Sequence, residues 1–322
     1  MNVLITGGLG YIGGRIASYL KEKNPDIHIF LTTRKYRKHF PEWAKSFTIV
    51  PMDLLDEQSI QKCVSNCKPN CVIHLAAMNE IDSVANPELA QEVNYRGTEK
   101  ILQAVHANGA KRFIYFSTFH VYNKGIEPVI TEQTLTQPSH PYAVTHLAAE
   151  KVVVSFRDKG MNTLIFRLSN VYGYPMDKEI NRWMLLVNDL CRQVVVTNRI
   201  FLKSSWKQYR DFISLHDVAR AVDYFLFTIP DAWEDGFYNL GGNCTMSILE
   251  IAHKVSEVYC KKYHKDVVKI ETPPKHTDGD NPLYFSYSIN KLMATGFHLK
   301  GDIEVELSKT MDVCEEFLDG RS

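Results

Sequence analysis

Residues 6–13 read Thr6-Gly7-Gly8-Leu9-Gly10-Tyr11-Ile12-Gly13. They follow a short apolar run over residues 2–6 and precede a helical pattern over residues 11–23. Glycine permits a tight turn and lets backbone N–H groups approach a pyrophosphate, and the start of the next helix offers unpaired donors and a positive dipole end. Because the glycines stand between a strand and a helix, they predict a site for the pyrophosphate of NAD or NADP.

Short apolar runs alternate with longer helical patterns through the first half of the chain. Strands are expected at residues 2–6, 27–33, 47–51, 71–75, 112–117 and 162–168, and helices at residues 11–23, 57–65, 87–108 and 142–159. Continuous apolar strands between helices are typical of a parallel sheet covered on both faces. The sequence therefore predicts an α/β fold with a Rossmann-like doubly wound parallel sheet.

The pattern loosens after residue 175. Helices are expected at residues 182–192, 217–227, 248–262 and 303–318, and extended segments at residues 201–213 and 238–242. We expect a dinucleotide-binding Rossmann domain over residues 1–175 and a smaller substrate-binding cap over residues 176–322, with some segments returning to the sheet. The cap is expected at the carboxyl edge of the sheet, where ligands bind in open α/β folds.

Composition and charge narrow the class of protein. Lys plus Arg and Asp plus Glu number 37 each, so the net charge is zero, and without a basic run no nucleic-acid partner is expected. No apolar stretch approaches a membrane span and no secretory signal is visible, so we expect a cytoplasmic protein without a membrane partner. The seven cysteines form no disulfide framework. Cys63, Cys67 and Cys71 recur every fourth residue, but no histidine pair completes a zinc set, so no metal is expected.

The end of the second predicted strand discriminates between the two dinucleotides. An acidic residue there accepts a hydrogen bond from the ribose 2′-hydroxyl of NAD. This chain has Thr32-Thr33-Arg34-Lys35 instead. The Arg34 guanidinium suits a 2′-phosphate through charge-assisted hydrogen bonds. The sequence therefore favours NADP over NAD; the alternative is that both basic side chains are simply solvated.

Further motifs extend over nearly the whole chain. They are Asp53-Leu54, His74-Leu75-Ala76-Ala77, Asn94-Tyr95-Arg96-Gly97-Thr98, Phe116-Ser117-Thr118-Phe119-His120-Val121-Tyr122, Pro141-Tyr142-Ala143-Val144-Thr145-His146, Arg167-Leu168-Ser169-Asn170-Val171-Tyr172-Gly173 and Tyr209-Arg210-Asp211-Phe212. With the glycine turn, this set resembles the extended short-chain dehydrogenase/reductase family, in its sugar-nucleotide epimerase/dehydratase group. The resemblance implies that the cofactor is bound by Thr6, Gly7, Gly10, Tyr11, Ile12, Gly13, Asp53, Leu54, Leu75, Ala76, Ala77, Asn94, Tyr142, His146 and Ser169, to which the charge argument adds Arg34.

The resemblance also implies catalytic roles. Tyr142 matches the family's base and Thr118 the residue that hydrogen-bonds the reacting oxygen. Position 146 is histidine where the family has lysine. Imidazole is shorter and mostly neutral at pH 7, so it lowers the tyrosine pKa less. Three alternatives stay open: His146 substitutes imperfectly in a working enzyme, another group supplies the charge, or the protein binds its ligands without efficient turnover.

Two departures from the family narrow the reaction. Its dehydratases have Asp-Glu directly after the active-site threonine, whereas this chain has Phe119-His120. The loss of both carboxylates argues against 4,6-dehydration. Two interpretations of His120 stay open: it acts as an acid or base on the sugar, or it is a hydrogen-bonded histidine beside the sheet edge. A second branch places a histidine shortly after the segment that begins at Tyr172, and this chain has none there. A 4-epimerase, a 4-dehydrogenase or a ketoreductase remains.

The resemblance implies a nucleoside-diphosphate sugar as the partner. Asn170 and Arg210 match the positions that hold the diphosphate, and Lys275 or His276 stands where the family often has a further arginine. Asp211 and Asp217 are interpreted as structural. We expect a homodimer, because helices corresponding to residues 87–108 and 142–159 often form the dimer interface in proteins of this group. The rival hypothesis is a catalytically impaired regulatory protein that binds NADP and a nucleotide sugar on the same fold.

Overall fold

The computed structural model describes residues 1–34, 39–122, 128–202, 206–231, 233–273 and 284–319. The chain groups into two compact units, each assembled from segments that are distant in sequence. Unit 1 comprises Met1–Lys124, Glu132–Leu168 and Ala219–Leu240, and unit 2 comprises Gly125–Thr131, Ser169–Val218 and Gly241–Ser322. The two units are groups of residues that contact one another and say nothing about function. The expected division into a dinucleotide-binding and a substrate-binding part between residues 175 and 176 therefore stays a prediction.

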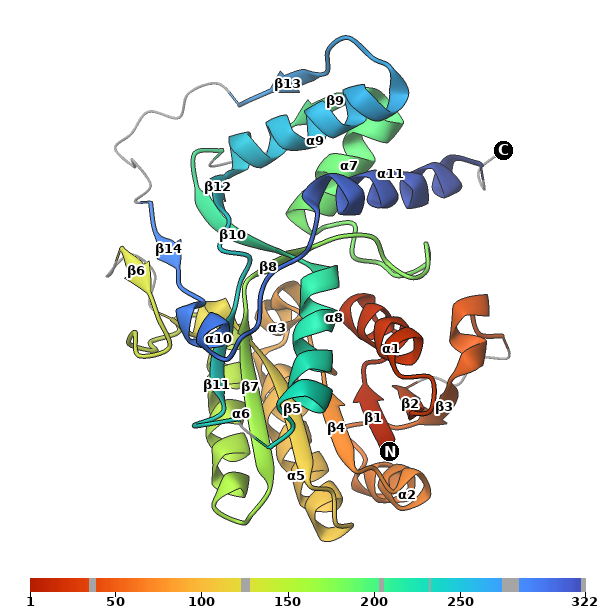
Figure 1. Cartoon of the computed structure of the whole chain (residues 1–322), viewed down its shortest axis with the longest axis vertical. Helices are drawn as coiled ribbons and strands as arrows, with labels where there is room; N and C mark the ends of the chain where they lie inside the picture. The colour runs from red at the N-terminus through yellow and green to blue at the C-terminus, as the bar shows by residue number, and fades with distance from the viewer. Residues whose placement is uncertain (35–38, 123–127, 203–205, 232, 274–283, 320–322) are drawn as a thin grey trace. The chain divides into compact units, whose positions relative to one another are not determined.

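Unit 1 is built on a parallel sheet of seven strands in the order β11-β7-β5-β4-β1-β2-β3 (Figure 1). The strands are β1 (Asn2–Thr6), β2 (His28–Thr33), β3 (Thr48–Pro51), β4 (Cys71–His74), β5 (Arg112–Thr118), β7 (Asn162–Leu168) and β11 (Phe237–Leu240). Apart from β3 at the sheet edge, their side chains are largely buried, as expected for a sheet covered on both faces. The predicted Rossmann-like fold is confirmed, and β11, the expected late strand, returns to this sheet beside β7.

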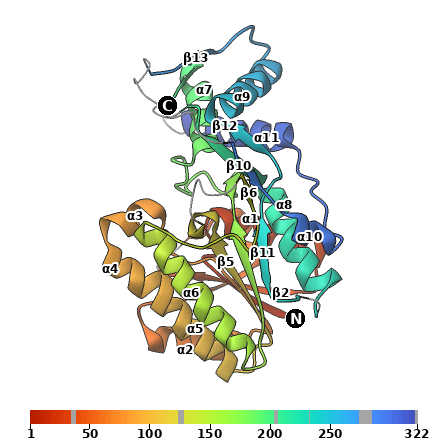
Figure 2. The same ribbon diagram turned by 90° about the vertical axis from the view of Figure 1, so that its left-hand side faces the viewer.

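Helices cover both faces of the unit 1 sheet. They are α1 (Tyr11–Lys23), η1 (Glu42–Ser46), α2 (Glu57–Cys67), α3 (Glu80–Ala85), α4 (Pro87–Ala90), η2 (Gln91–Arg96), α5 (Gly97–Ala107), η3 (Phe119–Val121), α6 (Pro141–Arg157) and η4 (Tyr224–Thr228). Figure 2 shows α5 and α6 side by side on one face of the sheet, and α6 packs on β5 and β7. This packing places one face of α6 against the ends of the central strands.

The long helix expected over residues 87–108 is interrupted by a π-helical segment. Asn86 caps α4 by accepting a hydrogen bond from the Leu89 amide at 3.0 Å, and Pro87 takes the first helical position. The segment η2 follows, and α5 begins at Gly97. A Cβ at Gly97 would lie 3.0 Å from the Leu54 side chain, so glycine permits close packing where the helix resumes. The π-helical turn is a deviation that hydrophobic periodicity does not reveal.

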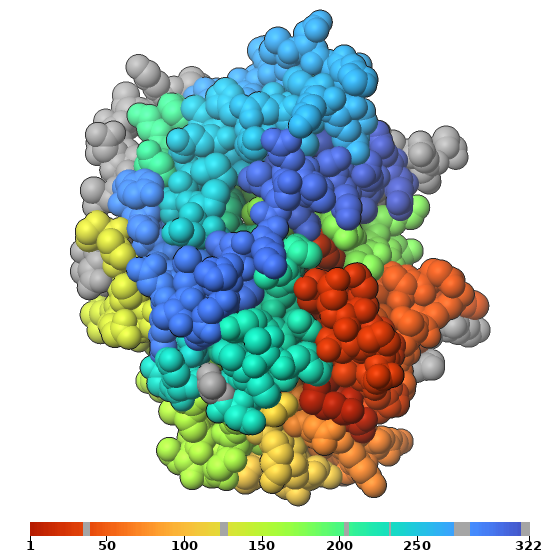
Figure 3. Space-filling view, viewed as in Figure 1, coloured from red at the N-terminus to blue at the C-terminus, as the bar shows by residue number. Residues whose placement is uncertain are grey.

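Unit 2 combines small sheets with a helical layer. Its strands are β6 (Val129–Ile130), β8 (Asn170–Tyr172), β9 (Arg199–Phe201), β10 (Tyr209–Ser214), β12 (Thr245–Ser247), β13 (Lys269–Glu271) and β14 (Ser286–Tyr287), and its helices are α7 (Leu186–Thr197), α9 (Ile248–Tyr263), α10 (Asn290–Ala294) and α11 (Ile303–Asp319). The helix α8 (Leu215–Asp223) begins in unit 2 and ends in unit 1. Figure 3 shows the dark blue surface of α11 beside the cyan surface of α9. Val255 of α9 and Met311 of α11 are buried in a common core to which α7 also contributes.

Two expected elements of unit 2 differ from those observed. The helix expected over residues 182–192 begins later, at Leu186, and continues to Thr197 because its buried residues recur at helical spacing through Val194. The extended segment expected over residues 201–213 comprises two strands that pair in separate sheets, β9 with β13 and β10 with β8 and β12. The helix α9 begins as its sequence indicates, because Ser247 and Glu250 form a capping box.

Candidate active site

The glycine turn joins β1 to α1 and leaves the helix N-terminus open to an anion. Gly7 has a φ of +67°, which glycine adopts without strain. A Cβ at Gly13 would lie 2.5 Å from the carbonyl oxygen of Gly7, so the turn has no room for a side chain there. Gly10 is the N-cap of α1, which has no side-chain cap bond and no acidic residue in its first turn. These features fit the pyrophosphate of a dinucleotide.

A buried hydrogen-bond chain supports this turn from the neighbouring strand. The Thr6 hydroxyl oxygen accepts from the amides of Leu75 and Ala76, each at 3.1 Å. Its proton is therefore donated to Nδ1 of His74 at 2.7 Å, which leaves Nε2–H of His74 to donate to Thr98 at 3.0 Å. Burial lowers the pKa of His74 to about 3, so the imidazole is neutral. This series of hydrogen bonds fixes the ends of β1 and β4, where the predicted cofactor contacts lie.

Asn94 is buried, and its side chain links two segments of the predicted site. Its side-chain oxygen accepts from the Met78 amide at 2.7 Å, and its Nδ2 donates to the Thr145 hydroxyl at 3.1 Å. Thr145 in turn donates to the Tyr142 carbonyl at 2.9 Å. Through these bonds Asn94 positions the first turn of α6, and its direct contact with a cofactor stays a prediction.

The predicted catalytic residues of unit 1 come from β5 and α6. Thr118 is the last residue of β5, and its hydroxyl accepts from the His120 amide at 3.2 Å. Pro141 occupies the first turn of α6 and Tyr142 follows it, so the tyrosine projects from the helix N-terminus. The rings of Tyr142 and His146, one helical turn apart, are 4.5 Å apart in a T-shaped arrangement.

His146 is buried, being only 3% exposed, and it is neutral. Burial lowers its pKa to about 3. Its Nδ1 lies 2.7 Å from the hydroxyl of Tyr115, and its Nε2 has no hydrogen-bond partner among the described residues. Burial also raises the pKa of Tyr115 well above its usual range. Position 146 therefore supplies no positive charge to Tyr142, and the catalytic role of His146 stays a prediction.

Two more histidines surround Tyr142. The His140 ring lies parallel to the Tyr142 ring at 6.1 Å, and the His120 ring lies 6.4 Å from Tyr142 and 5.4 Å from His140. Glu80 lies 4.0 Å from Nε2 of His140. His140 was not anticipated, although its place directly before Pro141-Tyr142 was a usable signal. The imidazoles of His120 and His140 thus border the predicted base.

A buried ion pair behind β5 was also not anticipated. Glu150 accepts from the Arg167 guanidinium at 2.7 and 3.1 Å and from the Ser117 hydroxyl at 2.5 Å. Arg167 also donates to the Tyr122 hydroxyl at 2.9 Å. The two charged side chains are 3% and 7% exposed. Because Glu150 is one turn after His146 on α6, this network fixes α6 against β5 and β7.

The remaining predicted cofactor residues of unit 1 are distributed around the same sheet edge. Arg34 is exposed just after β2. Asp53 accepts a hydrogen bond from the Leu55 amide at 3.0 Å, and Leu54 is buried against Gly97. Tyr11 is buried in the first turn of α1, Ile12 and Ala76 are half-buried, and Ala77 is exposed. Their contacts with a cofactor stay predictions.

The predicted substrate residues lie on neighbouring strands of unit 2. Asn170 in β8 is in register with Phe212 in β10, and Arg210 is two residues earlier in β10, so Asn170 and Arg210 share a face of that sheet. Asn170 donates to the Asp211 carbonyl at 3.0 Å, and Ser169 is buried directly before it. Lys275 and His276 lie outside the described residues.

Both aspartates interpreted as structural hold backbone amides in unit 2. Asp211 accepts from the amides of Gly242 and Cys244, each at 2.9 Å. Asp217 accepts from the amides of Lys300 and Gly301 at 2.8 and 2.7 Å. The Ser214 hydroxyl accepts from the Asp217 amide at 3.0 Å at the start of α8. Asp217 lies in the first turn of this helix and anchors the loop at residues 300–301 to it.

All seven cysteines are free thiols. Across the described part of the chain, no three His, Cys, Asp or Glu side chains gather as metal ligands, and the expected absence of a metal stays a prediction. In the same residues no helix has the length and apolar character needed to cross a membrane.

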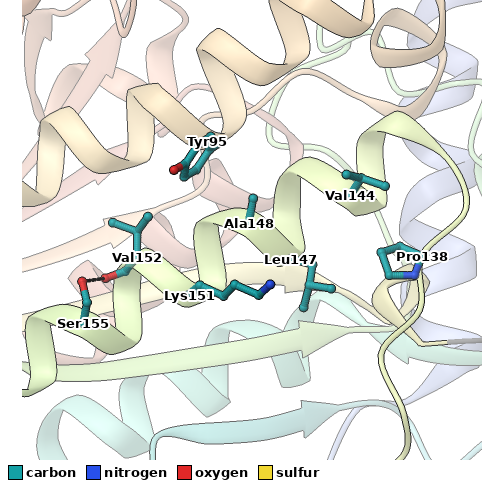
Figure 4. A pocket seen from close by; sticks show the side chains of 8 residues that line it. All are labelled: Tyr95, Pro138, Val144, Leu147, Ala148, Lys151, Val152 and Ser155. Atoms are coloured by element: carbon teal, nitrogen blue, oxygen red, sulfur yellow. Dashed lines mark hydrogen bonds between the residues drawn. The ribbon is translucent and has the colours of Figure 1, made fainter.

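A pocket of about 380 Å³ lies on a different face of α6 (Figure 4). It is lined by Tyr95, Pro138, Val144, Leu147, Ala148, Lys151, Val152 and Ser155. Tyr142, His146 and Glu150 follow each other at intervals of four along the helix and lie on the face toward the sheet. The pocket is thus separate from the predicted catalytic residues.

Comparison with known proteins identifies a family over most of the chain. A sequence model described as the NAD dependent epimerase/dehydratase family matches residues 3–241. The dTDP-D-glucose 4,6-dehydratase of Mus musculus is 26% identical over 325 residues, which cover 96% of this chain and 87% of the mouse protein.

Solved structures share the fold over nearly the whole chain. The Thermus thermophilus UDP-glucose 4-epimerase, solved with NAD, is 24% identical with a TM-score of 0.78, and the match covers 98% of this chain and 99% of that one. RMD from Pseudomonas aeruginosa, solved with NADPH, is 21% identical with a TM-score of 0.77, covering 98% and 100%. Structures with either dinucleotide therefore share this fold.

Proposed function

Because this chain belongs to the NAD dependent epimerase/dehydratase family, we propose that it is an epimerase or oxidoreductase of a nucleoside-diphosphate sugar. The reaction is a 4-epimerisation, a 4-dehydrogenation or a keto reduction. The observation that supports this most directly is the arrangement of Tyr142 and Thr118 at the ends of α6 and β5, with Phe119 and His120 following the threonine. The cytoplasm is the proposed compartment.

Tyr142 is the proposed base, and it takes the proton of the sugar hydroxyl. Thr118 donates a hydrogen bond to the same oxygen and so orients it. The chemistry that the cofactor supplies when bound is reversible hydride transfer. Because His146 is neutral, position 146 does not supply the cation that stabilises a tyrosinate elsewhere in the family, and a slower proton transfer is expected unless another group supplies that charge.

The residues after Thr118 argue against sugar dehydration. Elimination of water needs an acid and a base beside the reacting carbons. Phe119 is apolar, and His120 is the only one of the two residues that can exchange a proton. The mouse relative is named as a dehydratase, so this exclusion rests on the two substituted positions and is tested directly by product analysis.

NADP is the proposed cofactor, because the exposed Arg34 follows β2 at the position where an acidic residue selects NAD. A guanidinium that binds a 2′-phosphate contributes about 1.5–3 kcal/mol, or roughly a tenfold to hundredfold preference. Calorimetry with NADPH and NADH on wild type and Arg34→Ala tests this. The preference is expected to disappear in the variant and to persist in Arg199→Ala, which removes an exposed arginine of unit 2. Equal affinity of the wild type for both dinucleotides would refute the NADP assignment.

Asn170 and Arg210 are the proposed diphosphate ligands. The amide donates a hydrogen bond to phosphate oxygens, and the planar guanidinium makes two parallel ones. Both side chains share a face of the β8–β10 pair, which supports a common ligand. Arg210→Lys keeps the charge but loses the fork, so the KM for the nucleotide sugar is expected to rise with little change in dinucleotide affinity.

The rival proposal is a regulatory protein that binds NADP and a nucleotide sugar without turnover, and the neutral His146 favours it. Turnover is measured with NADP(H) and NAD(H) against UDP-, GDP-, CDP- and dTDP-sugars, with products identified by mass spectrometry. An active wild type that loses turnover in Tyr142→Phe but not in Tyr284→Phe, an exposed tyrosine, supports the enzyme. A wild type that is inactive until His146→Lys is introduced supports the rival, and failure to bind either dinucleotide overturns both.

A homodimer through the outer face of α6 is also proposed. Val144 is 44% exposed and Leu147 adjoins it in the pocket of Figure 4, where Tyr95 of η2 completes an apolar surface. Exposed apolar patches of this kind mark interfaces. Leu147→Glu is expected to yield a monomer in sedimentation, whereas Val267→Glu, on an exposed residue of unit 2, leaves the dimer intact. A monomeric wild type would contradict the proposal.

A further inference from the structure

A column of aromatic rings runs from β4 through β5 to α6 in unit 1. The His74 ring is stacked on Tyr115 at 5.9 Å, Tyr115 lies 5.8 Å from His146, and His146 lies 4.5 Å from Tyr142. Only the last of these residues projects from the start of α6; the first three are buried. The column therefore links the proposed base to the strand that supports the glycine turn.

The hydrogen bond between Tyr115 and His146 has a defined direction. The Tyr115 hydroxyl is buried, and the 2.7 Å contact with Nδ1 of His146 is the hydrogen bond that the structure gives it. A phenol that stays protonated has one proton to donate, and an unpaired buried donor is costly. Tyr115 therefore donates to Nδ1, and the proton of the neutral imidazole resides on Nε2.

The Nε2–H group of His146 is then a buried donor that lacks a partner in the described part of the chain. Buried polar groups are nearly always hydrogen-bonded, and exceptions call for an explanation such as a functional role. The ring is held on both sides, by Tyr115 through Nδ1 and by the edge-to-face contact with Tyr142. The unpaired donor is thus held in a defined orientation beside the proposed base.

We propose that Tyr115 is a positioning residue that fixes His146 as its neutral Nε2–H tautomer, so that position 146 acts as an uncharged hydrogen-bond donor to a hydroxyl oxygen of a bound ligand. This rests on the proposed function, because the ligand is the dinucleotide or the nucleotide sugar. Tyr115 itself touches neither ligand and acts through the imidazole.

The surroundings of His146 keep this donor uncharged across neutral pH. The titratable groups that face it are Tyr115 from β5, His74 from β4 and Tyr142 from its own helix. The nearby carboxylate of Glu150 is held by the Arg167 guanidinium in β7. Ligand affinity through this donor is consequently expected to be constant between pH 5.5 and 8, unlike that of a titrating cation.

Nuclear magnetic resonance of the ligand-free chain with ¹⁵N-labelled histidine tests the tautomer without any need for turnover. Two-bond ¹⁵N–¹H correlations are expected to show a protonated Nε2 and an unprotonated Nδ1 for His146 from pH 8 to 5.5. In Tyr115→Phe both tautomers are expected to be populated. The matched control is Tyr238→Phe, another buried tyrosine of unit 1 that lies outside the Glu150–Arg167 network, and it is expected to leave the His146 signals unchanged.

Ligand binding supplies the second arm of the experiment. NADPH and UDP-glucose are added separately, and the one that carries the acceptor oxygen shifts the Nε2–H proton and slows its exchange with water. Tyr115→Phe is expected to weaken binding of that ligand by about two- to tenfold. An Nδ1–H tautomer in the free wild type, or an imidazolium at pH 6, overturns the proposal. The proposal is also overturned if calorimetry shows that both ligands bind but the Nε2–H signal responds to neither of them. If neither ligand binds, the proposed function itself is refuted.

Discussion

The neutral, buried imidazole of His146 leads to a quantitative prediction about how the free energy of unfolding depends on pH. A histidine has a pKa of about 6.5 in the unfolded chain, and burial lowers that of His146 to about 3 in the folded chain. Between these values the unfolded state binds a proton that the folded state does not, so stability is lost as the pH falls from 6.5 toward 3. Each pH unit in this window costs about 1.4 kcal/mol, so His146 accounts for about 2 kcal/mol of lost stability between pH 7 and pH 5.

His146→Gln removes the titrating group while keeping a polar side chain of similar reach. Urea unfolding followed by circular dichroism gives the free energy of unfolding at pH 7 and pH 5 for each protein. The variant is expected to be less stable at pH 7, because its packing and hydrogen bond to Tyr115 are imperfect. Its loss of stability from pH 7 to pH 5 should nevertheless be about 2 kcal/mol smaller than that of the wild type.

Tyr115→Phe serves as the control, because it breaks the same hydrogen bond but retains the imidazole. It should keep the pH dependence of the wild type even though its stability is lower throughout. The contribution of His74 is common to all three proteins and cancels in the comparison. If His146→Gln lost as much stability between pH 7 and pH 5 as the wild type, the imidazole would already be charged or accessible in the fold, and the argument from burial would be refuted.

Three further predictions concern the turn, the ion pair and a buried anchor. Gly13→Ala brings a Cβ to 2.5 Å from the Gly7 carbonyl oxygen, so dinucleotide affinity measured by calorimetry should fall by more than about tenfold; unchanged affinity would exclude this turn as the binding site. Arg167→Met leaves Glu150 buried without its partner, so the free energy of unfolding in urea should fall by about 3–5 kcal/mol. Adding Glu150→Gln should recover part of that loss. If the effects of the two substitutions simply add in the double variant, the two residues are not coupled. Asp217→Asn replaces a carboxylate that accepts from two backbone amides, so a loss of about 1–3 kcal/mol is expected, and a loss below 0.5 kcal/mol would remove its anchoring role.

Local sequence determined the parallel sheet and the glycine turn. Apolar strand runs and helical periodicity depend on neighbours within a few residues, so β1, α1 and α6 are readable from the chain. Gly7 and Gly13 are likewise prescribed locally, because the turn needs a positive φ and close backbone approach. Motif spacing also identified Tyr142 and Thr118 as candidates, although their roles stay proposals.

The partners of those residues depend on contacts that are remote in sequence, and these emerged only from the folded chain. Tyr115 and His146 are 31 residues apart in the sequence, and they meet because β5 packs beneath α6. The same packing removes water from the imidazole and so decides its charge, which no local pattern reports. The substitution of histidine for lysine was visible in the sequence from the start. That this histidine is neutral, held through one nitrogen and left with a single donor is a consequence of burial and of strand pairing.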